Sequence, residues 1–126
     1  MVNIAQLGLL ILLSLFLVLH FVILLKLIPY NLVWSGRLKS DKEMVRLEIF
    51  SILINSLFVI VIIVQGNFLS IDIPKKIITY ALWVMTGLFL LNTVGNATSK
   101  NKIEQRLFTP ITILLVIFSL ILALSN

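Results

Sequence analysis

Four long runs of apolar residues alternate with shorter segments that hold most of the polar and charged residues. The runs cover about 7–28, 49–68, 77–96 and 108–125. At 1.5 Å per residue, about twenty helical residues cross a bilayer core of about 30 Å. The first three runs reach that length, and the fourth reaches it by starting before Pro110. Because hydrocarbon offers no partner for an unpaired backbone group, each run is predicted to be a helix.

These runs are apolar nearly all round, whereas a helix of a soluble bundle is apolar along one stripe only. The first run is also longer than the apolar core of a signal peptide, and no small-residue cleavage site follows it, so we expect it to be retained. The predicted fold is an all-α integral membrane protein, an antiparallel bundle of four transmembrane helices. It forms a single domain over 1–126.

Composition and charge support a membrane protein. Hydrophobic residues make up 60% of the chain and charged residues only 12%, and the net charge is +5. In a membrane protein, excess lysine and arginine record orientation and contact with anionic lipid, so no nucleic-acid partner is expected. The absence of cysteine excludes disulfides, thiolate metal sites and thiol catalysis.

The basic residues gather in two of the three connecting segments, loops 29–48 and 97–107. The remaining loop holds only Lys75 and Lys76. The positive-inside rule therefore predicts a multi-pass protein of the cell membrane with both loops in the cytoplasm and both termini outside. The residues expected to contact lipid headgroups are Arg37, Lys39, Lys42, Arg46, Lys100, Lys102 and Arg106.

The two basic loops resemble each other, with Gly36 and Ser40 of the first matching Gly95 and Ser99 of the second. The chain is therefore also interpreted as two candidate copies of one helical hairpin, related by an axis along the membrane normal.

Each basic loop carries a helix-start signal. Ser40 and Glu43 fit a capping box, in which the hydroxyl and the carboxylate satisfy free backbone amides, and 101–104 offers a similar pattern. Each loop is expected to become a short amphipathic helix that continues into the next span. In the first of these helices, Met44 and Leu47 would face lipid.

Polar residues within the runs are candidate site residues, because polar groups inside a bilayer are costly. His20 and Asn55 both lie about 10–12 Å from the cytoplasmic end by helix rise. A cytoplasm-facing polar pocket is therefore predicted, closed on the outer side by apolar packing. Its expected residues are His20, Glu48, Ser51, Asn55, Asn92, Asn96, Thr109 and Thr112.

His20 and Glu48 each allow more than one interpretation. His20 either hydrogen-bonds a neighbouring helix or has a proton or ligand role, and one histidine cannot supply an axial pair of haem ligands within a monomer. Glu48 is expected at the interface, paired with a basic residue. The expected partners are Arg46, Arg106 and Lys102.

Two further patterns predict contacts between helices. Asn55 and Asn92 are expected to form interhelical hydrogen bonds. A stripe of mostly small residues in the fourth run has the spacing that lets helices approach closely in lipid. Its members are Thr109, Thr112, Val116, Ser119 and Ala123.

No phosphate-binding glycine loop, metal-ligand cluster or Ser-His-Asp set is evident, so no catalytic residue, metal site or cofactor is assigned. The leading hypothesis is a non-enzymatic protein that transports a small solute or ion as a homo-oligomer in the bilayer. The alternatives are an accessory, immunity or assembly protein of the membrane, and a membrane enzyme that uses Glu48 or His20 as acid or base on a lipophilic substrate.

Overall fold

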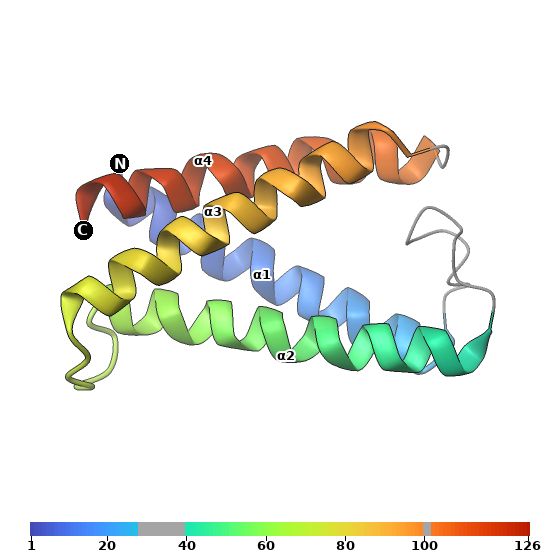
Figure 1. The fold of residues 1–126 in the computed structure, drawn as a ribbon, viewed down its shortest axis with the longest axis horizontal. Coiled ribbons are helices and arrows are strands. Elements are labelled where there is room, and N and C mark those ends of the chain that lie inside the picture. Colours follow the sequence, from blue (N-terminus) through green and yellow to red (C-terminus); the bar gives the residue numbers. More distant parts are fainter. Residues whose placement is uncertain (28–39, 100–101) are drawn as a thin grey trace.

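A computed structural model describes residues 1–27, 40–99 and 102–126. Over these ranges the chain is helical and contains no strand, and successive helices run in opposite directions, with both termini at one end (Figure 1). A short π-helix, η3, leads into the last helix. The elements are α1 (Val2–Leu24), α2 (Asp41–Gln65), α3 (Lys75–Ala97), η3 (Glu104–Phe108) and α4 (Thr109–Ser125).

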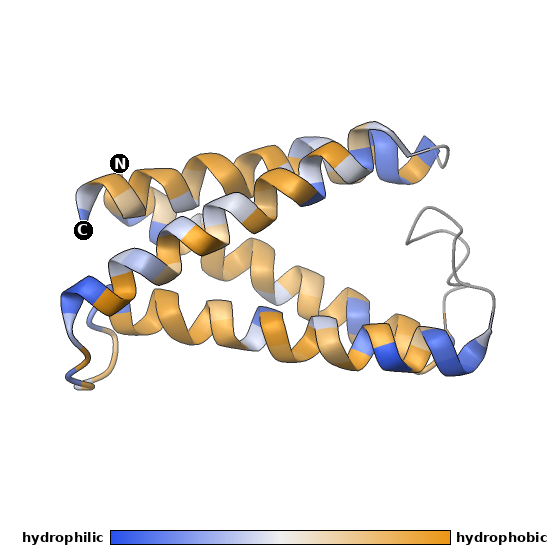
Figure 2. Cartoon of the chain, in the orientation of Figure 1, coloured by the Kyte–Doolittle hydropathy of each residue, from blue (hydrophilic) through white to orange (hydrophobic). Residues whose placement is uncertain are grey.

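Four helical segments are long and apolar enough to cross a membrane, the fourth being η3 together with α4 (Glu104–Ser125). Hydrophobic residues dominate the middle of each helix and hydrophilic residues gather near the ends (Figure 2). Many large apolar side chains, such as Leu15, Leu53 and Leu91, are exposed on the outside of the bundle. Exposed apolar area of this extent is unusual for a soluble monomer, and it is the surface that lipid would cover. The prediction of four span-like helices is confirmed.

The bounds of the first two helices differ from the expected 7–28 and 49–68. α1 begins at Val2 and ends at Leu24, and α2 begins at Asp41. The helix expected before the second apolar run is present, and it is continuous with α2.

A left-handed residue ends α1 before Pro29. Lys26 has φ 62°, its N–H donates to the Ile23 carbonyl, and the Leu27 N–H donates to the Val22 carbonyl. These two bonds form a Schellman motif, which satisfies the last carbonyls of a helix. The side chain of Lys26 then pairs with Asp41, at 2.8 Å between Nζ and Oδ2, and so joins the end of α1 to the start of α2.

The hydroxyl half of the capping box predicted for α2 is present, but the face assigned to Met44 is wrong. The Ser40 hydroxyl accepts a hydrogen bond from the Glu43 N–H at 3.2 Å, which satisfies one free donor of the first turn. Met44 is fully buried in a small cluster with Ile23 and Phe108. The first turn of α2 packs on the end of α1, so this position faces protein.

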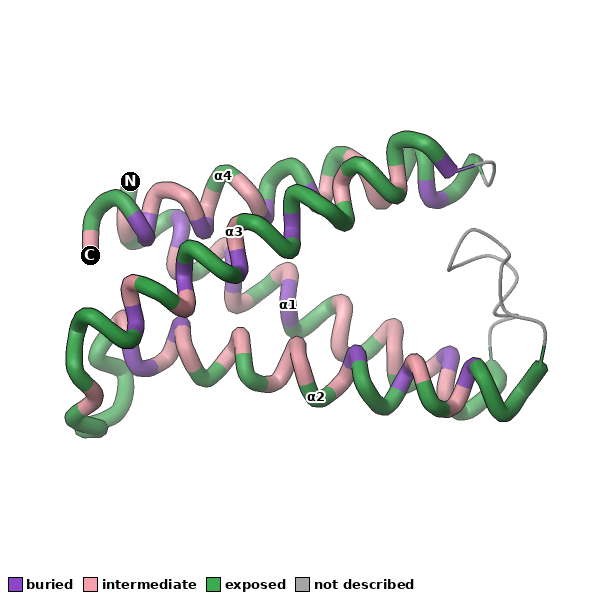
Figure 3. The backbone as a smooth tube through the Cα atoms, viewed as in Figure 1, coloured by how far each residue is buried: buried purple, intermediate pink, exposed green. Residues whose placement is uncertain are grey.

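The helices pack as two pairs, α1 with α2 and α3 with α4, joined by contact between α1 and α4, whereas α2 and α3 contact each other sparsely. Buried positions lie on the inner sides of the helices and exposed positions on the outer sides (Figure 3). The main core fills the half of the bundle near the termini. Its residues include Leu9, Leu13, Ile62, Leu82, Met85 and Leu122.

Close helix contacts hold this half together. Ser119 and Ala123 of the small-residue stripe are buried, and Thr86 of α3 donates to the Ser119 hydroxyl at 3.0 Å. Gly8 of α1 lies so close to α4 that an added Cβ would be 2.4 Å from the Phe118 ring.

At the end of the bundle near the termini, two polar contacts join neighbouring helices. Gln6 of α1 donates to Gln65 of α2 at 2.8 Å, and Asn126 donates to Thr79 of α3 at 2.7 Å.

Several sequence-based expectations fall on residues outside the described ranges. They concern the basic residues Arg37, Lys39 and Lys100, the matching Gly36, and the first residue of the second capping pattern, Asn101.

Candidate functional site

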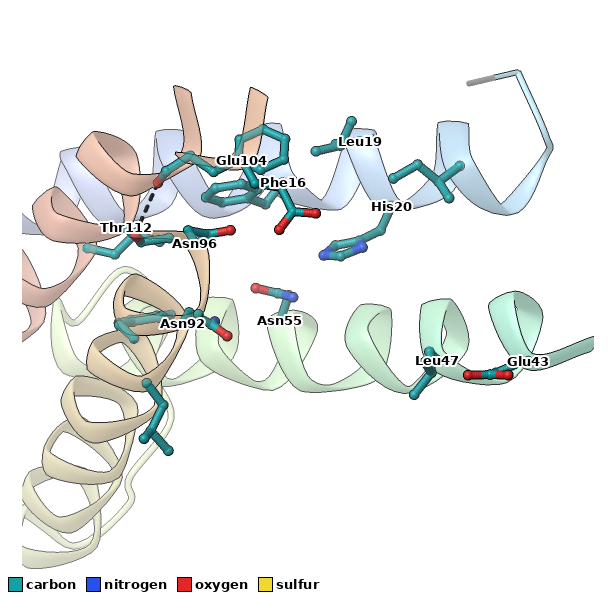
Figure 4. A pocket seen from close by; sticks show the side chains of 16 residues that line it. Phe16, Leu19, His20, Glu43, Leu47, Asn55, Asn92, Asn96, Glu104 and Thr112 are labelled. Carbon is teal, nitrogen blue, oxygen red and sulfur yellow. Dashed lines mark hydrogen bonds between the residues drawn. The ribbon is translucent and has the colours of Figure 1, made fainter. Parts of the chain in front are cut away.

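A pocket of about 510 Å³ lies in the other half of the bundle, where Phe89 and Leu115 of the main core form part of its lining. Each of the four span-like segments contributes polar side chains to it, and these point toward a shared space (Figure 4). Its polar lining consists of His20 from α1, Glu43 and Asn55 from α2, Asn92 and Asn96 from α3, Glu104 from η3 and Thr112 from α4.

His20 forms a short contact with Glu48 of α2, 2.5 Å between Nδ1 and Oε2. Glu48 is 0% exposed, and the His20 side chain is 18% exposed and lines the pocket. The hydrogen bond between neighbouring helices expected for His20 is confirmed. This hydrogen bond lowers the cost of placing a carboxyl group inside the bundle.

The expected position and pairing of Glu48 are wrong. The predicted interfacial carboxylate, paired with Arg46, Arg106 or Lys102, is instead buried against an imidazole. Arg46 is exposed, as are Lys102 and Arg106 of the fourth segment. Glu48 points inward because α2 packs this face on α1.

The asparagines line the pocket and do not join the helices. The Asn55 side chain donates to the Ser51 carbonyl of its own helix at 2.8 Å, so the interhelical bond predicted for it is wrong. Among the described residues, the Asn92 and Asn96 side chains form no hydrogen bond. Their amides are therefore available to a ligand in the pocket.

Glu104 is a pocket residue that sequence reasoning missed. It is buried, at 3% exposed, and Figure 4 shows its carboxylate directed toward the space between His20 and Asn55. A signal was present, because Glu104, Phe108 and Thr112 follow one another at four-residue spacing and continue the small-residue face of the last helix. In the sequence, Glu104 instead fits the last position of the capping pattern at 101–104.

Glu104 is the first residue of the π-helix η3. A π-turn adds a residue to the helical repeat, and such turns are frequent at functional sites. Two threonines bond to carbonyls in and next to this turn: Thr109 donates to the Glu104 carbonyl at 3.4 Å, and Thr112 donates to the Phe108 carbonyl at 3.0 Å.

Of the predicted site residues, the structure brings His20, Asn55, Asn92, Asn96 and Thr112 together around one pocket. Glu48 lies behind His20, while Ser51 and Thr109 do not line the pocket. Among the residues that the structure describes, the pocket lining contains two carboxylates, Glu43 and Glu104, and no lysine or arginine.

Basic side chains surround this end of the molecule without lining the pocket. The described ones are Lys42, Arg46, Lys102 and Arg106, and all four are exposed. Within 1–27, 40–99 and 102–126, no group of three or more His, Asp or Glu residues is arranged to hold a metal ion.

No protein-family model matches the sequence, and neither the curated proteins nor the solved structures give a match. Function is therefore argued from the chemistry of the pocket.

Proposed function

We propose that this chain is a multi-pass protein of the cell membrane whose pocket binds a small solute or ion from the cytoplasmic side and takes part in its transport. The observation that carries the proposal is the convergence of His20, Asn55, Asn92 and Glu104, one or more polar groups from each span-like segment, on one pocket. Polar groups at membrane depth are costly, so four helices that direct them to one place indicate a ligand site.

The proposed orientation rests on the ends of the helices. Lys42, Arg46, Lys102 and Arg106 lie at the pocket end, and Lys75 and Lys76 begin α3 at the opposite end. Under the positive-inside rule the pocket opens toward the cytoplasm and both termini lie outside. The exposed basic side chains would then meet the anionic headgroups of the inner leaflet.

An oligomer is part of the proposal. The core fills the outer half of a single bundle, so one copy offers access from one side only. The apolar outer faces leave room for further copies, which would form a closed symmetric assembly. The pairing of α1 with α2 and of α3 with α4 supports the interpretation of two related hairpins.

The pocket is tested by removing two amides that line it. Purified protein in phosphatidylcholine vesicles is adsorbed on a sensor, and charge movement is recorded after steps of tetramethylammonium, of acetate and of protons. The Asn55→Leu/Asn92→Leu variant is expected to lose the wild-type signal by about tenfold or more, which is at least about 1.4 kcal/mol of binding. Asn3→Leu, an exposed change near the N-terminus, is the control and should keep the signal. Equal signals from wild type and the double variant would refute the pocket as the site.

A second candidate function is favoured by the contact between His20 and Glu48. A carboxylate on Nδ1 orients an imidazole so that Nε2 acts as a general base, and His20 lines the pocket. The protein would then be a membrane enzyme that acts on a lipophilic substrate. Turnover of p-nitrophenyl decanoate that disappears in His20→Gln, with the Asn3→Leu control active, would favour this function over transport.

A further inference from the structure

Polar contacts join α1 and α2 at both ends of the bundle, and the two contacts differ in their chemistry. Near the termini, the Gln6 amide donates to the Gln65 side chain at 2.8 Å, and an amide does not titrate. At the pocket end, His20 and Glu48 form a hydrogen bond of 2.5 Å, and both of these side chains can bind or release a proton. Because a neutral amide pair is sufficient to join these helices, the titratable pair beside the pocket is suited to more than joining them.

His20 connects this pair with the pocket. Glu48 is fully buried and is not part of the pocket lining, whereas the partly exposed His20 side chain lines the pocket. Nδ1 of His20 contacts Glu48, so Nε2 is the ring nitrogen that remains for proton exchange with the pocket. Histidine is the side chain whose ordinary charge change lies closest to neutral pH, and His20 is the only histidine of the chain.

The charged groups near His20 leave it accessible to a proton. On the pocket side, Glu43 of α2 is exposed, and Glu104 of η3 is buried with an interaction of its own. Within the described part of the lining, α1, α3 and α4 contribute no titratable side chain besides His20, and no lysine or arginine repels a proton there. The exposed charged residues at this end that do not line the pocket are Lys26, Asp41, Lys42, Arg46, Lys102 and Arg106.

We propose that the His20–Glu48 pair is a proton-binding site and that the ion taken up by the pocket from the cytoplasmic side is H⁺. In the accepting state, Nδ1–H donates to the Glu48 carboxylate and Nε2 carries no proton. A hydronium ion in the pocket transfers a proton to Nε2 and is left as water, and the Nδ1 proton moves to Oε2 of Glu48. The pair gains one proton and loses its net negative charge, and release reverses both transfers. This inference rests on the proposed binding pocket and names its ion.

The single histidine allows proton binding to be observed directly. The full chain is labelled with ¹⁵N-histidine, reconstituted in phosphatidylcholine vesicles and followed by solid-state NMR between about pH 5 and about pH 8. As the pH falls, the wild-type ring should stay neutral while its proton moves from Nδ1 to Nε2. In Glu48→Gln, which has no carboxylate to receive a proton, the ring should become doubly protonated instead. A wild-type ring that keeps its high-pH signals over the whole range would overturn the proposal, and one that becomes doubly protonated would overturn the transfer to Glu48.

A variant that keeps the helix contact separates proton binding from a structural role. His20→Gln retains an amide that can hydrogen-bond Glu48 but does not titrate. On vesicles adsorbed on a sensor, it should lose most of the charge displaced by a pH step, while its free energy of unfolding stays close to that of the wild type. Gln6→Leu, which removes the neutral contact between the same two helices, is the control and should keep the charge signal. Equal charge displacement in wild type and His20→Gln would overturn the proposal.

Steps of other ions separate this inference from the proposed function. The Asn55→Leu/Asn92→Leu variant removes amides of the pocket and keeps His20. If this variant loses the response to tetramethylammonium or acetate while His20→Gln leaves every pH response unchanged, the pocket binds another solute and the proton proposal is wrong. If neither variant changes any response, both proposals are wrong.

Discussion

His20 lines the pocket and forms a hydrogen bond with the buried Glu48. The carboxylate is fully buried and its Oε2 lies 2.5 Å from Nδ1 of His20, so a short hydrogen bond joins the two side chains. Hydrogen bonds that involve a charged group are worth about 1.5–3 kcal/mol in folded proteins. If either residue is removed, the other remains inside the bundle without this hydrogen bond.

This pairing predicts strong coupling in a double-mutant cycle. His20→Leu and Glu48→Leu are each expected to lower the free energy of unfolding, and the double variant should cost about 2 kcal/mol less than the sum, because the bond can be lost only once. Titration with sodium dodecyl sulfate, followed by circular dichroism, measures the four unfolding free energies. Additive effects would show that the two side chains do not interact in the membrane.

Gly8 and Gly87 predict opposite effects of the same substitution. Gly8→Ala should destabilise the protein by about 1–3 kcal/mol, since its Cβ would lie 2.4 Å from the Phe118 ring and the ring must move. Gly87→Ala meets open space and should gain up to about 1 kcal/mol from helix propensity.

The same unfolding titration compares these two variants. Adding Phe118→Leu to Gly8→Ala should recover part of the loss, because the smaller side chain makes room for the new Cβ. A Gly8→Ala variant as stable as Gly87→Ala would contradict the close approach of α1 and α4.

The pocket residues that the sequence predicts best are those whose assignment depends only on their depth in the membrane. His20 and Asn55 could be assigned to one level of the membrane from their distance to the span ends, and the structure brings them to one pocket. The partner of Glu48 could not be predicted, because it depends on how α1 and α2 are rotated about their axes. Glu104 was missed because its apparent place in a loop concealed a helical face.

At the scale of elements, hydropathy predicts the helices and local chemistry predicts where some of them begin. Ser40 caps α2 as its capping pattern indicates. The end of α1 was predicted too late, since no glycine marks it: a lysine adopts φ 62°, and Pro29 lies further on. The π-helix could not be predicted either, because the residues of Glu104–Phe108 are compatible with an ordinary α-turn.

The cap of α2 can be tested by a single change. Ser40→Ala removes the acceptor of the Glu43 N–H and is expected to destabilise the protein by about 1 kcal/mol. Ser40→Asp should retain most of the stability, because a carboxylate also accepts at a helix start and interacts well with the helix dipole. Ser70→Ala, an exposed position between α2 and α3, is the control. Equal unfolding free energies for Ser40→Ala and Ser70→Ala would show that the cap contributes no stability.

At the scale of the whole molecule, the bundle is divided into a packed half and a polar half. The apolar core and the contacts of Gln6 with Gln65 and of Asn126 with Thr79 lie near the termini, and the pocket lies at the opposite end. An apolar core at the end opposite the pocket agrees with the expectation that apolar packing closes the pocket on one side. The orientation of the two halves across the membrane remains a prediction from charge.

The orientation predicts which positions a membrane-impermeant maleimide can reach. The natural chain has no cysteine, so single-cysteine variants give an unambiguous signal. In intact cells, Ser70→Cys and Asn126→Cys should be labelled, while Ser40→Cys should be labelled only after the membrane is permeabilised. The reverse pattern would place the pocket on the outer side, and labelling of all three in intact cells would indicate insertion in both orientations.

The close approach of α1 and α4 at Gly8 has a mechanical consequence. A tight contact near one end of two long rods acts as a fulcrum, and His20 lies twelve residues further along α1, a lever arm of about 18 Å at 1.5 Å per residue. With that arm, a tilt of about 5° displaces the far end by about 1.6 Å, more than half the length of a hydrogen bond. A tilt of α1 about this contact would therefore change the width of the pocket more than the packing around Gly8.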